Sequence, residues 1–416
     1  MNEVNDSVVI IGGGVAGDSC VTELRRQGFS GRVTIIGEEP WRPYERPPLS
    51  KLALREPELI AQSFFLKPED WYQENAVELI LGRRVTGIDL HGRKLTTDTG
   101  EGMSFGRLLI ATGGDVRRVR PDQGDDALNV NYLRTKDDAL RLARQLSPGI
   151  RLAVVGMGVI GSELAATARQ LGCEVRAIEP EPAPMVRALG AEMGGWLASV
   201  HEEHGVRVSY GRSLRRFVRD GDRVCALECD DGAILECDVV GVGIGIIPRS
   251  ELAVRAELAV ADGIVVDSSN RTSCDFVFAA GDVARVPAAG GRTVRYETYQ
   301  NAADQGAIAA RAMLGDTSRP PLPCSFWTDQ YDLSIQIVGT VSDGLARVRR
   351  SLPNGGFAQL YLADGVVAGC VAVNAGRDLI LLRRMVIAGT PADPEALASP
   401  DIPLRQILGK VVRNPI

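Results

Sequence analysis

The stretch SVVIIGGGVAG, at residues 7–17, carries the strongest fold signal in this chain of 416 residues. An apolar run of strand type leads into Gly12, Gly14 and Gly17, and the overlapping segment Val15–Gln27 has the pattern of a helix. A strand, a G-x-G-x-x-G turn and a helix in this order predict a dinucleotide site. Gly12 permits the tight turn, Gly14 lets the backbone approach a pyrophosphate, and Gly17 lets the helix pack against the strand. The helix N-terminus then offers its free N–H groups to the phosphates.

The same arrangement recurs farther along the chain. Arg151–Val155 has the pattern of a strand, and Gly156, Gly158 and Gly161 repeat the triplet before a helix-like segment at Ser162–Leu171. We therefore expect two nucleotide-binding folds of common design in tandem.

In each copy, a second strand-like segment ends beside an acidic residue. Arg32–Ile36 leads to Glu38, and Glu174–Ile178 leads to Glu179. A carboxylate at this position accepts hydrogen bonds from a ribose diol. Because both copies keep three glycines and the acid, we expect both to bind a dinucleotide; the alternative is that one copy serves only as a scaffold.

The later parts of the two copies also correspond. Each continues with a strand-like pair and a last short segment, at 86–90, 93–97 and 108–110 in the first copy and at 223–229, 234–236 and 239–243 in the second. A third motif, FVFAAGDV at 276–283, places Asp282 beside a helix start, where a carboxylate suits the ribityl or pyrophosphate part of a dinucleotide. Two dinucleotides on one chain predict a relay between a tightly held flavin and an exchangeable nicotinamide.

The composition argues against several classes of protein. The formal net charge of −6 and the pI near 5.4 argue against a nucleic-acid-binding protein. Residues 1–7 carry no lysine or arginine, and the longest apolar run, at 239–247, is far shorter than the ~18 residues of a membrane span. We therefore expect no signal peptide, no membrane association and a cytoplasmic location. The eight cysteines are scattered without a C-x-x-C pair, and there are three histidines, so we predict no metal site.

The two glycine motifs, ATGG at 111–114 and FAAGDVA at 278–284 together resemble the two-dinucleotide-binding flavoproteins. The resemblance implies that the first motif holds FAD, that the second holds NAD(P)H, and that Gly281-Asp282 returns the chain to the FAD domain. It implies an α/β fold with two tandem Rossmann-like domains of the glutathione-reductase type and a C-terminal α+β domain. The expected boundaries are 1–115 with 245–318 for a discontinuous FAD-binding domain, 116–244 for the NADH-binding domain, and 319–416 for the C-terminal domain.

Residues 41–51 narrow the resemblance. Disulfide reductases of this superfamily carry a redox pair of cysteines here, and NADH oxidases and peroxidases carry one reactive cysteine, but this stretch is WRPYERPPLSK. It cannot store electrons as a disulfide or a sulfenic acid. The segment at 44–51 instead resembles the ferredoxin reductases of bacterial Rieske-type oxygenases and related cytochrome monooxygenases, a group that includes putidaredoxin reductases. Further matches span nearly the whole chain: YLRT at 132–135, RYETYQNA at 295–302 and FWTDQY at 326–331.

The resemblance implies an FAD-dependent NADH:ferredoxin reductase. Hydride passes from NADH to FAD, and single electrons pass to a [2Fe–2S] ferredoxin, Rieske-type or Cys-ligated, that feeds an oxygenase. Two alternatives stay open: a diaphorase or NADH oxidase, and a flavin-bound signalling or scaffold protein related to apoptosis-inducing factors. The lack of cysteine at 41–51 counts against efficient oxidases, and the lack of long insertions counts against the second alternative. The sequence is compatible with a monomer or a homodimer.

The first glycine loop predicts the contacts of FAD. We expect the pyrophosphate at Gly12, Gly14, Ala16 and Gly17, and the adenosine ribose at Glu38. By resemblance, the backbone of Val85 contacts the adenine, and the other FAD-binding residues are Arg46, Lys51, Ala111, Arg134, Asp282, Glu297 and Tyr299. For Arg46 and Arg134 the alternative is a solvated surface position. Tyr299 departs from many relatives, which have tryptophan or a smaller apolar residue, so we expect altered packing against the flavin.

The second glycine loop predicts the contacts of NADH. The expected residues are Gly156, Gly158, Ile160, Gly161, Glu179 and Gly243, with Arg187 against the adenosine end. The carboxylate of Glu179 repels a 2′-phosphate, so the sequence predicts NADH rather than NADPH.

Three residues are expected at the reaction centre. The resemblance implies that Lys51 and Glu163 lie together beside flavin N5, where the lysine stabilises negative charge and the glutamate orients it. Glu163 has the alternative role of complementing the helix dipole. Trp327 is expected beside the isoalloxazine, or else in the C-terminal core. Candidate charges for docking an acidic ferredoxin are Arg311, Arg349, Arg350, Arg383 and Arg384.

Overall fold

The computed structural model describes residues 6–120, 126–317 and 323–412, which form two compact units. The first unit comprises Met1–Pro47, Gln62–Asp115 and Ile246–Leu322, and the second comprises Pro48–Ala61, Val116–Gly245 and Pro323–Ile416. The second glycine motif and the C-terminal region thus belong to one unit. The boundary predicted at 318/319 lies outside the described residues.

A five-stranded parallel sheet forms the centre of the first unit. Its order is β19 (Val277–Ala279), β7 (Arg107–Ile110), β1 (Ser7–Ile11), β2 (Arg32–Gly37) and β3 (Val77–Leu81). The runs of valine, isoleucine and leucine suit strands that are buried on both faces, and every residue of β1 is buried. The carboxyl ends of these strands share one edge, where dinucleotides bind in such sheets.

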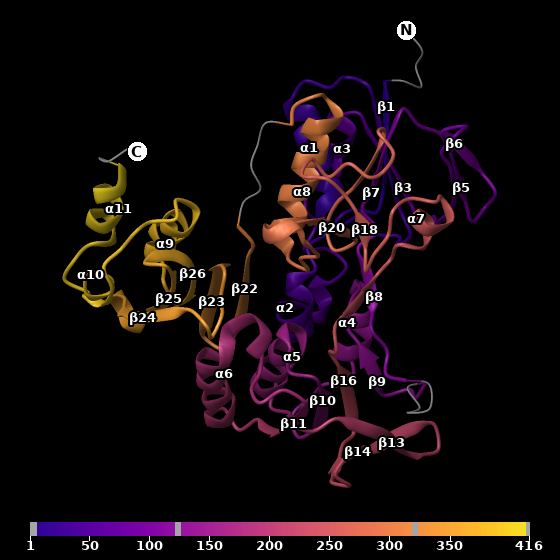
Figure 1. Ribbon diagram of the computed structural model, residues 1–416. Coiled ribbons are helices and arrows are strands. Elements are labelled where there is room, and N and C mark those ends of the chain that lie inside the picture. The colour runs from indigo at the N-terminus through magenta and orange to yellow at the C-terminus, as the bar shows by residue number, and fades with distance from the viewer. Residues whose placement is uncertain (1–5, 121–125, 318–322, 413–416) are drawn as a thin grey trace. The chain divides into compact units, whose positions relative to one another are not determined.

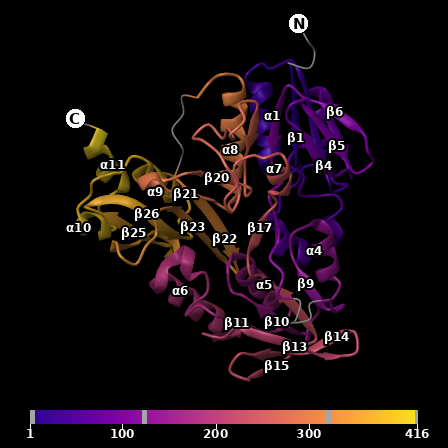
Figure 2. The ribbon, with the colours of Figure 1, turned by 45° about the vertical axis from the view of Figure 1, so that its right-hand side comes forward.

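Two helices cover one face of this sheet, and they lie side by side in Figures 1 and 2. These are α1 (Val15–Arg26) and α8 (Tyr299–Met313). A Cβ added at Gly306 would lie 2.1 Å from the backbone oxygen of Ala16, so glycine allows the two backbones to touch. The other face packs on β4 (Val85–Asp89), β5 (Lys94–Thr97), β6 (Gly102–Ser104) and α7 (Glu251–Arg255), which contribute to a second hydrophobic core.

The second unit contains a parallel sheet of the same design. Its order is β12 (Arg207–Tyr210), β11 (Glu174–Glu179), β10 (Arg151–Val155), β16 (Val239–Val242) and β9 (Val130–Tyr132). The helix after the second glycine loop is α5 (Val159–Gln170), which begins three residues earlier than predicted because it starts directly after Gly158. The predicted repeat of two nucleotide-binding folds is confirmed.

Further helices and strands precede the C-terminal region in the second unit. They are η1 (Pro47–Ser50), α2 (Leu52–Arg55), α4 (Lys136–Ala143), α6 (Val186–Glu203), and the antiparallel strands β13 (Leu214–Asp220), β14 (Arg223–Cys229) and β15 (Ile234–Glu236).

The C-terminal region forms a five-stranded antiparallel sheet. Its order is β22 (Ser325–Gln330), β23 (Leu333–Gly339), β26 (Val366–Val373), β25 (Phe357–Ala363) and β24 (Ala346–Ser351). One face packs on α9 (Asp378–Ile387), α10 (Pro394–Ala398) and α11 (Leu404–Val412), seen in Figure 2. The other face shares a hydrophobic core with α6.

In the part of the chain that the structure describes, no helix has the length and apolar character needed to cross a membrane.

Candidate functional site

The first glycine loop joins β1 to α1 with three glycines that act in different ways. Gly12 has a φ of +117°, and a Cβ there would lie 2.2 Å from the backbone oxygen of Ala111. A Cβ at Gly17 would lie 2.4 Å from the oxygen of Gly12. Both positions therefore require glycine for the fold itself, and the predicted site residue Ala111 is the neighbour that restricts Gly12.

Gly14 differs, because a Cβ there would meet nothing within 4 Å. Its backbone is extended, with φ −91° and ψ −177°, so the fold alone does not demand glycine. Gly14 is the N-cap of α1 and provides no side-chain cap to the helix N–H groups. A Cβ would fill the cradle in front of these groups, where a pyrophosphate binds. The loop therefore fits the phosphate part of a dinucleotide.

The second loop, between β10 and α5, repeats this geometry. A Cβ at Gly156, whose φ is +88°, would lie 2.7 Å from the oxygen of Gly243, and one at Gly161 would lie 1.9 Å from the oxygen of Gly156. A Cβ at Gly158 would again meet nothing within 4 Å. Gly243 thus corresponds to Ala111, and Ile160 is partly exposed on the first turn of α5. The second loop also fits a pyrophosphate.

Glu179 lies at the carboxyl end of β11, as predicted, and is 7% exposed. One of its carboxylate oxygens accepts the backbone N–H of Met157 at 2.5 Å, and the other accepts the N–H of Glu181 at 2.9 Å. These bonds fix the carboxylate beside the glycine loop. Glu181 also pairs with Arg187, at 2.6 Å, and the Arg187 side chain is 85% exposed.

Glu38 lies just beyond β2, at the equivalent position of the first fold. Its carboxylate is 2.6 Å from Nη1 of Arg249 and 3.8 Å from Nε of Arg84. Glu38 is therefore placed at the strand end as predicted but is flanked by two arginines, unlike Glu179.

Arg46 lies in a cluster of polar groups within the first unit. Its Nη2 is 2.7 Å from Glu39, and its Nη1 donates to the hydroxyl of Tyr44 at 3.1 Å. Although burial lowers the pKa of this guanidinium, three acidic neighbours raise it above its usual value: Tyr44, Glu39 and Asp282. Arg46 is thus half-buried and paired within the first unit, with Asp282 among the acidic groups that act on it.

Three other predicted FAD residues belong to the first unit: Tyr299, Glu297 and Val85. Tyr299 is the first residue of α8, and its hydroxyl donates to Glu45 at 3.3 Å. Burial and Glu45 raise the pKa of Tyr299 to about 12, so the phenol is protonated at neutral pH. Glu297 pairs with Arg295 at 2.6 Å, and Val85 is the buried first residue of β4.

Lys51 and Glu163 lie together in the second unit, as the resemblance implied. The Lys51 Nζ is 2.7 Å from Oε2 of Glu163, and the side chains are 15% and 3% exposed. Glu163 is the fifth residue of α5 and lies beyond its first turn. Arg134, predicted for the FAD site, also belongs to the second unit, where its backbone N–H donates to Asp138 at 3.1 Å.

Two hydroxyl groups that sequence reasoning missed also bind the Glu163 carboxylate. Ser50 donates to Oε2, and Thr328 of β22 donates to Oε1 at 2.8 Å. The sequence offered no local signal for Thr328. Only the structure shows that Thr328 and Gln330, at alternate positions of β22, are buried polar residues, which need partners.

Trp327 precedes Thr328 on β22 and points to the opposite face of the strand, since side chains alternate. It is half-buried and is not part of either hydrophobic core of the C-terminal region. Its place beside the isoalloxazine stays a prediction.

Two features of the described residues bear on metal binding and on disulfide formation. Within residues 6–120, 126–317 and 323–412, no three His, Cys, Asp or Glu side chains form a group that could hold a metal ion. The eight cysteines, all inside these ranges, are free, and none lies in 41–51.

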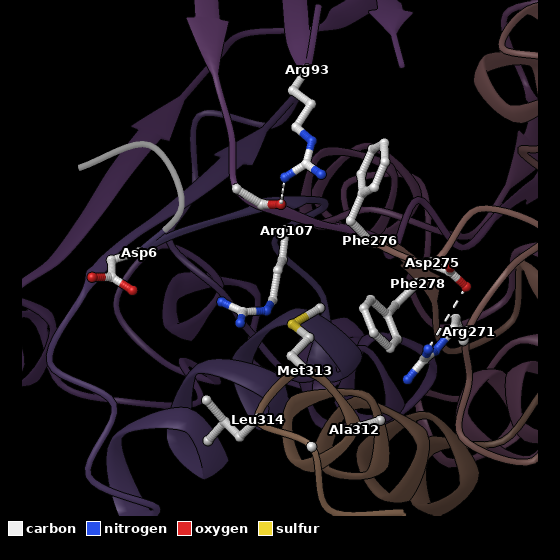
Figure 3. A pocket seen from close by; sticks show the side chains of 12 residues that line it. Asp6, Arg93, Arg107, Arg271, Asp275, Phe276, Phe278, Ala312, Met313 and Leu314 are labelled. Carbon is white, nitrogen blue, oxygen red and sulfur yellow. Dashed lines mark hydrogen bonds and ion pairs between the residues drawn. The ribbon is translucent and has the colours of Figure 1, made fainter. Parts of the chain in front are cut away.

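A pocket of about 580 Å³ lies in the first unit, at the edge of the sheet opposite the glycine loop (Figure 3). It is lined by residues at the amino ends of β1, β7 and β19. Arg93 donates to the oxygen of Gly106 at 3.3 Å and stacks 4.1 Å from the ring of Phe276, and Arg271 lies 3.8 Å from Asp275. The pocket is therefore separate from the dinucleotide cradle.

The docking prediction is wrong for two of the five candidate arginines, because their side chains are buried. Arg311 pairs with Glu23 at 2.9 Å between α8 and α1 and is 8% exposed. Arg350 is 4% exposed and donates to backbone oxygens of the C-terminal region: Leu397, Ser399 and Ile402. Arg349 and Arg384 are exposed, and Arg383 is partly exposed.

Comparisons with known proteins agree over almost the full length. The chain matches the family described as pyridine nucleotide-disulphide oxidoreductase over residues 6–306, and the one described as reductase C-terminal over residues 325–408. It is 38% identical over 407 residues to the ferredoxin–NAD(+) reductase component of the p-cumate 2,3-dioxygenase system of Pseudomonas putida, covering 97% of this chain and 99% of that one. It is 33% identical over 411 residues to putidaredoxin reductase of Pseudomonas putida, covering 97% of both chains. A solved structure, the covalent putidaredoxin reductase–putidaredoxin complex, matches with a TM-score of 0.91 and 32% identity, over 99% of this chain and 100% of that one.

Proposed function

Because this chain belongs to the pyridine nucleotide-disulphide oxidoreductase family and also carries its reductase C-terminal domain, we propose that it is an NADH-dependent reductase of a [2Fe–2S] ferredoxin in an oxygenase system. The family resemblance predicted from the sequence is confirmed, and FAD and NAD(H) are its cofactors. One observation carries the proposal: two glycine loops of matching geometry, one in each unit, each leave space in front of a helix N-terminus. FAD held at the first glycine loop would supply the acceptor for the hydride of NADH and the donor of single electrons to two ferredoxin molecules.

The residues of the second unit supply the electrostatics of the reaction in this proposal. The Lys51 ammonium stabilises negative charge on the reduced flavin ring, and Glu163 holds the ammonium in place. Neither side chain needs to abstract a proton from NADH, so positioning matters more than basicity. Trp327, half-buried on β22, is proposed to flank the isoalloxazine.

The proposed preference for NADH rests on Glu179. Its fixed carboxylate offers hydrogen bonds to a ribose 2′-OH and repels a 2′-phosphate. Arg187, the exposed cation nearby in sequence, is already paired with Glu181 at 2.6 Å. In this proposal Glu179 and Glu181 both weaken the binding of NADPH.

We expect the double variant Glu179→Gln/Glu181→Gln to shift coenzyme selectivity toward NADPH by about 100-fold, because two repulsive charges disappear and Arg187 is released. The amide introduced at position 179 keeps an acceptor for the Met157 N–H. The measurement is kcat/KM for NADH and NADPH with ferricyanide as acceptor. Adding Arg187→Ala to the double variant should remove the gain with NADPH while changing NADH kinetics little; an unchanged coenzyme ratio in the double variant would refute the role of Glu179.

The proposed partner is a [2Fe–2S] ferredoxin, of the Rieske or the Cys-ligated type. Relatives are named as ferredoxin reductase components, and the matching solved structure is a complex of putidaredoxin reductase with putidaredoxin. The exposed arginines Arg349 and Arg384 are the remaining predicted docking charges, with Arg383 partly exposed. The monomer or homodimer and the cytoplasmic location stay predictions.

We expect ferredoxin reduction to slow about tenfold between low and high salt, because exposed charges are screened beyond ~10 Å at 0.1 M ionic strength. Flavin reduction by NADH should change far less over the same range. Both half-reactions are measured separately by stopped-flow absorbance. Arg349→Glu and Arg384→Glu should each reduce the salt dependence of the second half-reaction. Arg350 is not substituted, because its side chain is buried. Equal salt dependence of the two half-reactions would exclude electrostatic docking.

A direct test separates the proposed function from its alternatives. The purified protein is reduced anaerobically with NADH and then mixed with oxygen, a quinone, a Rieske-type ferredoxin or a Cys-ligated ferredoxin. Fast reoxidation by one ferredoxin and slow reoxidation by oxygen and quinone support the proposal. Preferred reoxidation by oxygen or quinone indicates an oxidase or diaphorase. Slow reduction by NADH with a persistent charge-transfer band indicates a protein related to apoptosis-inducing factors.

A further inference from the structure

We propose that Thr328 is a positioning residue for hydride transfer: its hydroxyl fixes the Glu163 carboxylate and thereby the Lys51 ammonium. The C-terminal domain would then complete the electrostatics of the site in addition to serving a partner. This inference rests on the proposed function and adds a residue to it.

The carboxylate of Glu163 is bound at both oxygens. Oε2 receives the Lys51 ammonium at 2.7 Å and the hydroxyl of Ser50, and Oε1 receives the hydroxyl of Thr328 at 2.8 Å. Bonds on one oxygen alone would leave the carboxylate free to rotate about its last side-chain torsion, which is soft. The hydrogen bond from Thr328 to the other oxygen prevents this rotation. Since Lys51 has a flexible stem, the orientation of its ammonium depends on the carboxylate that it pairs with.

The single proton of the Thr328 hydroxyl is directed toward Glu163. Gln330 Nε2 donates to Thr328 Oγ1 at 3.1 Å, so the hydroxyl accepts there and keeps its proton for the carboxylate. Thr328 and Gln330 are 0% and 1% exposed. Water therefore does not compete for this hydrogen bond, and a bond to a charged group in such surroundings is strong.

The backbone around Thr328 is held by a sheet ladder. Thr328 pairs with Ile335 between β22, the edge strand, and β23 of the five-stranded sheet. Ser50 is anchored separately, because its backbone oxygen accepts the hydroxyl of Thr167 on α5 at 2.8 Å. The carboxylate is thus held between the loop that carries Lys51, its own helix and the C-terminal sheet, which is how a supporting shell fixes a catalytic group.

The decisive variant is Thr328→Val, which keeps the shape of the side chain and removes the hydroxyl. We expect the limiting rate of flavin reduction by NADH, in anaerobic stopped-flow, to fall about tenfold, with the Kd for NADH within about twofold of the unmodified value. Thr328→Ser should restore the rate to within about twofold. Flavin content and thermal unfolding check the fold of each variant.

Thr390→Val is the matched control. Thr390 is also a buried threonine of the C-terminal domain, at 0% exposed, but its hydroxyl has no hydrogen-bond partner in the described residues. This control should leave the rate unchanged. In a Glu163→Gln background, Thr328→Val should add less than about a twofold loss, because the carboxylate that the hydroxyl orients is already gone.

An unchanged rate in Thr328→Val, or the same tenfold loss in the Glu163→Gln background, would overturn the proposal. If Thr328→Val does not fold, Gln330→Leu serves instead: it frees the Thr328 hydroxyl to turn away, and a rate equal to that of the unmodified protein would also overturn the proposal. Failure of the unmodified protein to be reduced by NADH is a separate result, which would refute the proposed function itself.

Discussion

Gly14→Ala is expected to give a folded protein that loses its flavin, and Gly158→Ala a yellow protein that no longer binds NADH well. At both positions an added Cβ meets no protein atom within 4 Å, and the backbone is extended, so the apoprotein should be nearly as stable as before. The methyl group instead fills the space in which a pyrophosphate approaches the helix N–H groups. Losing two charge-assisted hydrogen bonds weakens binding by roughly 100-fold.

The measurements are the Kd for FAD, by titration of apoprotein, and the Kd for NADH, by anaerobic flavin reduction. Gly12→Ala is the contrasting variant, because its Cβ would lie 2.2 Å from the oxygen of Ala111 and its φ of +117° excludes other residues. It should lower thermal stability even without flavin. If Gly158→Ala loses flavin and Gly14→Ala keeps it, the two cofactors are assigned to the wrong folds.

The sequence was sufficient to predict the two nucleotide folds because each is encoded locally. The strand, the glycine triplet and the helix follow one another within residues 7–27. The strands β1 and β10 coincide with the apolar runs that precede the two glycine triplets. The steric need for glycine is also local: a Cβ at Gly161, for example, would lie 1.9 Å from the backbone oxygen of Gly156.

Long-range contacts were harder to predict. The hydrogen bond from Thr328 to Glu163 joins residues 165 positions apart, and nothing local marks a threonine in a strand as a partner of a helix glutamate. The burial of Arg311 and Arg350 escaped prediction for the same reason, since the carboxylate and the carbonyl oxygens that pair with them come from distant segments. An arginine in a sequence indicates that its charge needs a carboxylate, a carbonyl oxygen or water, but not which segment of the chain supplies that group.

Lys51→Met is expected to slow flavin reduction by NADH about 100-fold, because it removes a fixed positive charge where negative charge develops. The same variant should also destabilise the protein by about 3 kcal/mol, since it leaves the Glu163 carboxylate, 3% exposed, without its cation. A loss of activity in this variant alone would therefore not separate a catalytic lysine from a structural one.

The double variant Lys51→Met/Glu163→Gln separates them. Glutamine keeps oxygen and nitrogen atoms for Ser50 and Thr328 but carries no charge, so no unpaired ion stays buried and thermal stability should return close to that of the unmodified protein. The rate should stay about 100-fold low, because the ammonium is still missing. Thermal unfolding and anaerobic stopped-flow reduction are measured on the same preparations. If the rate recovers together with stability, Lys51 only neutralises a buried acid, and the electrostatics of hydride transfer must come from other residues.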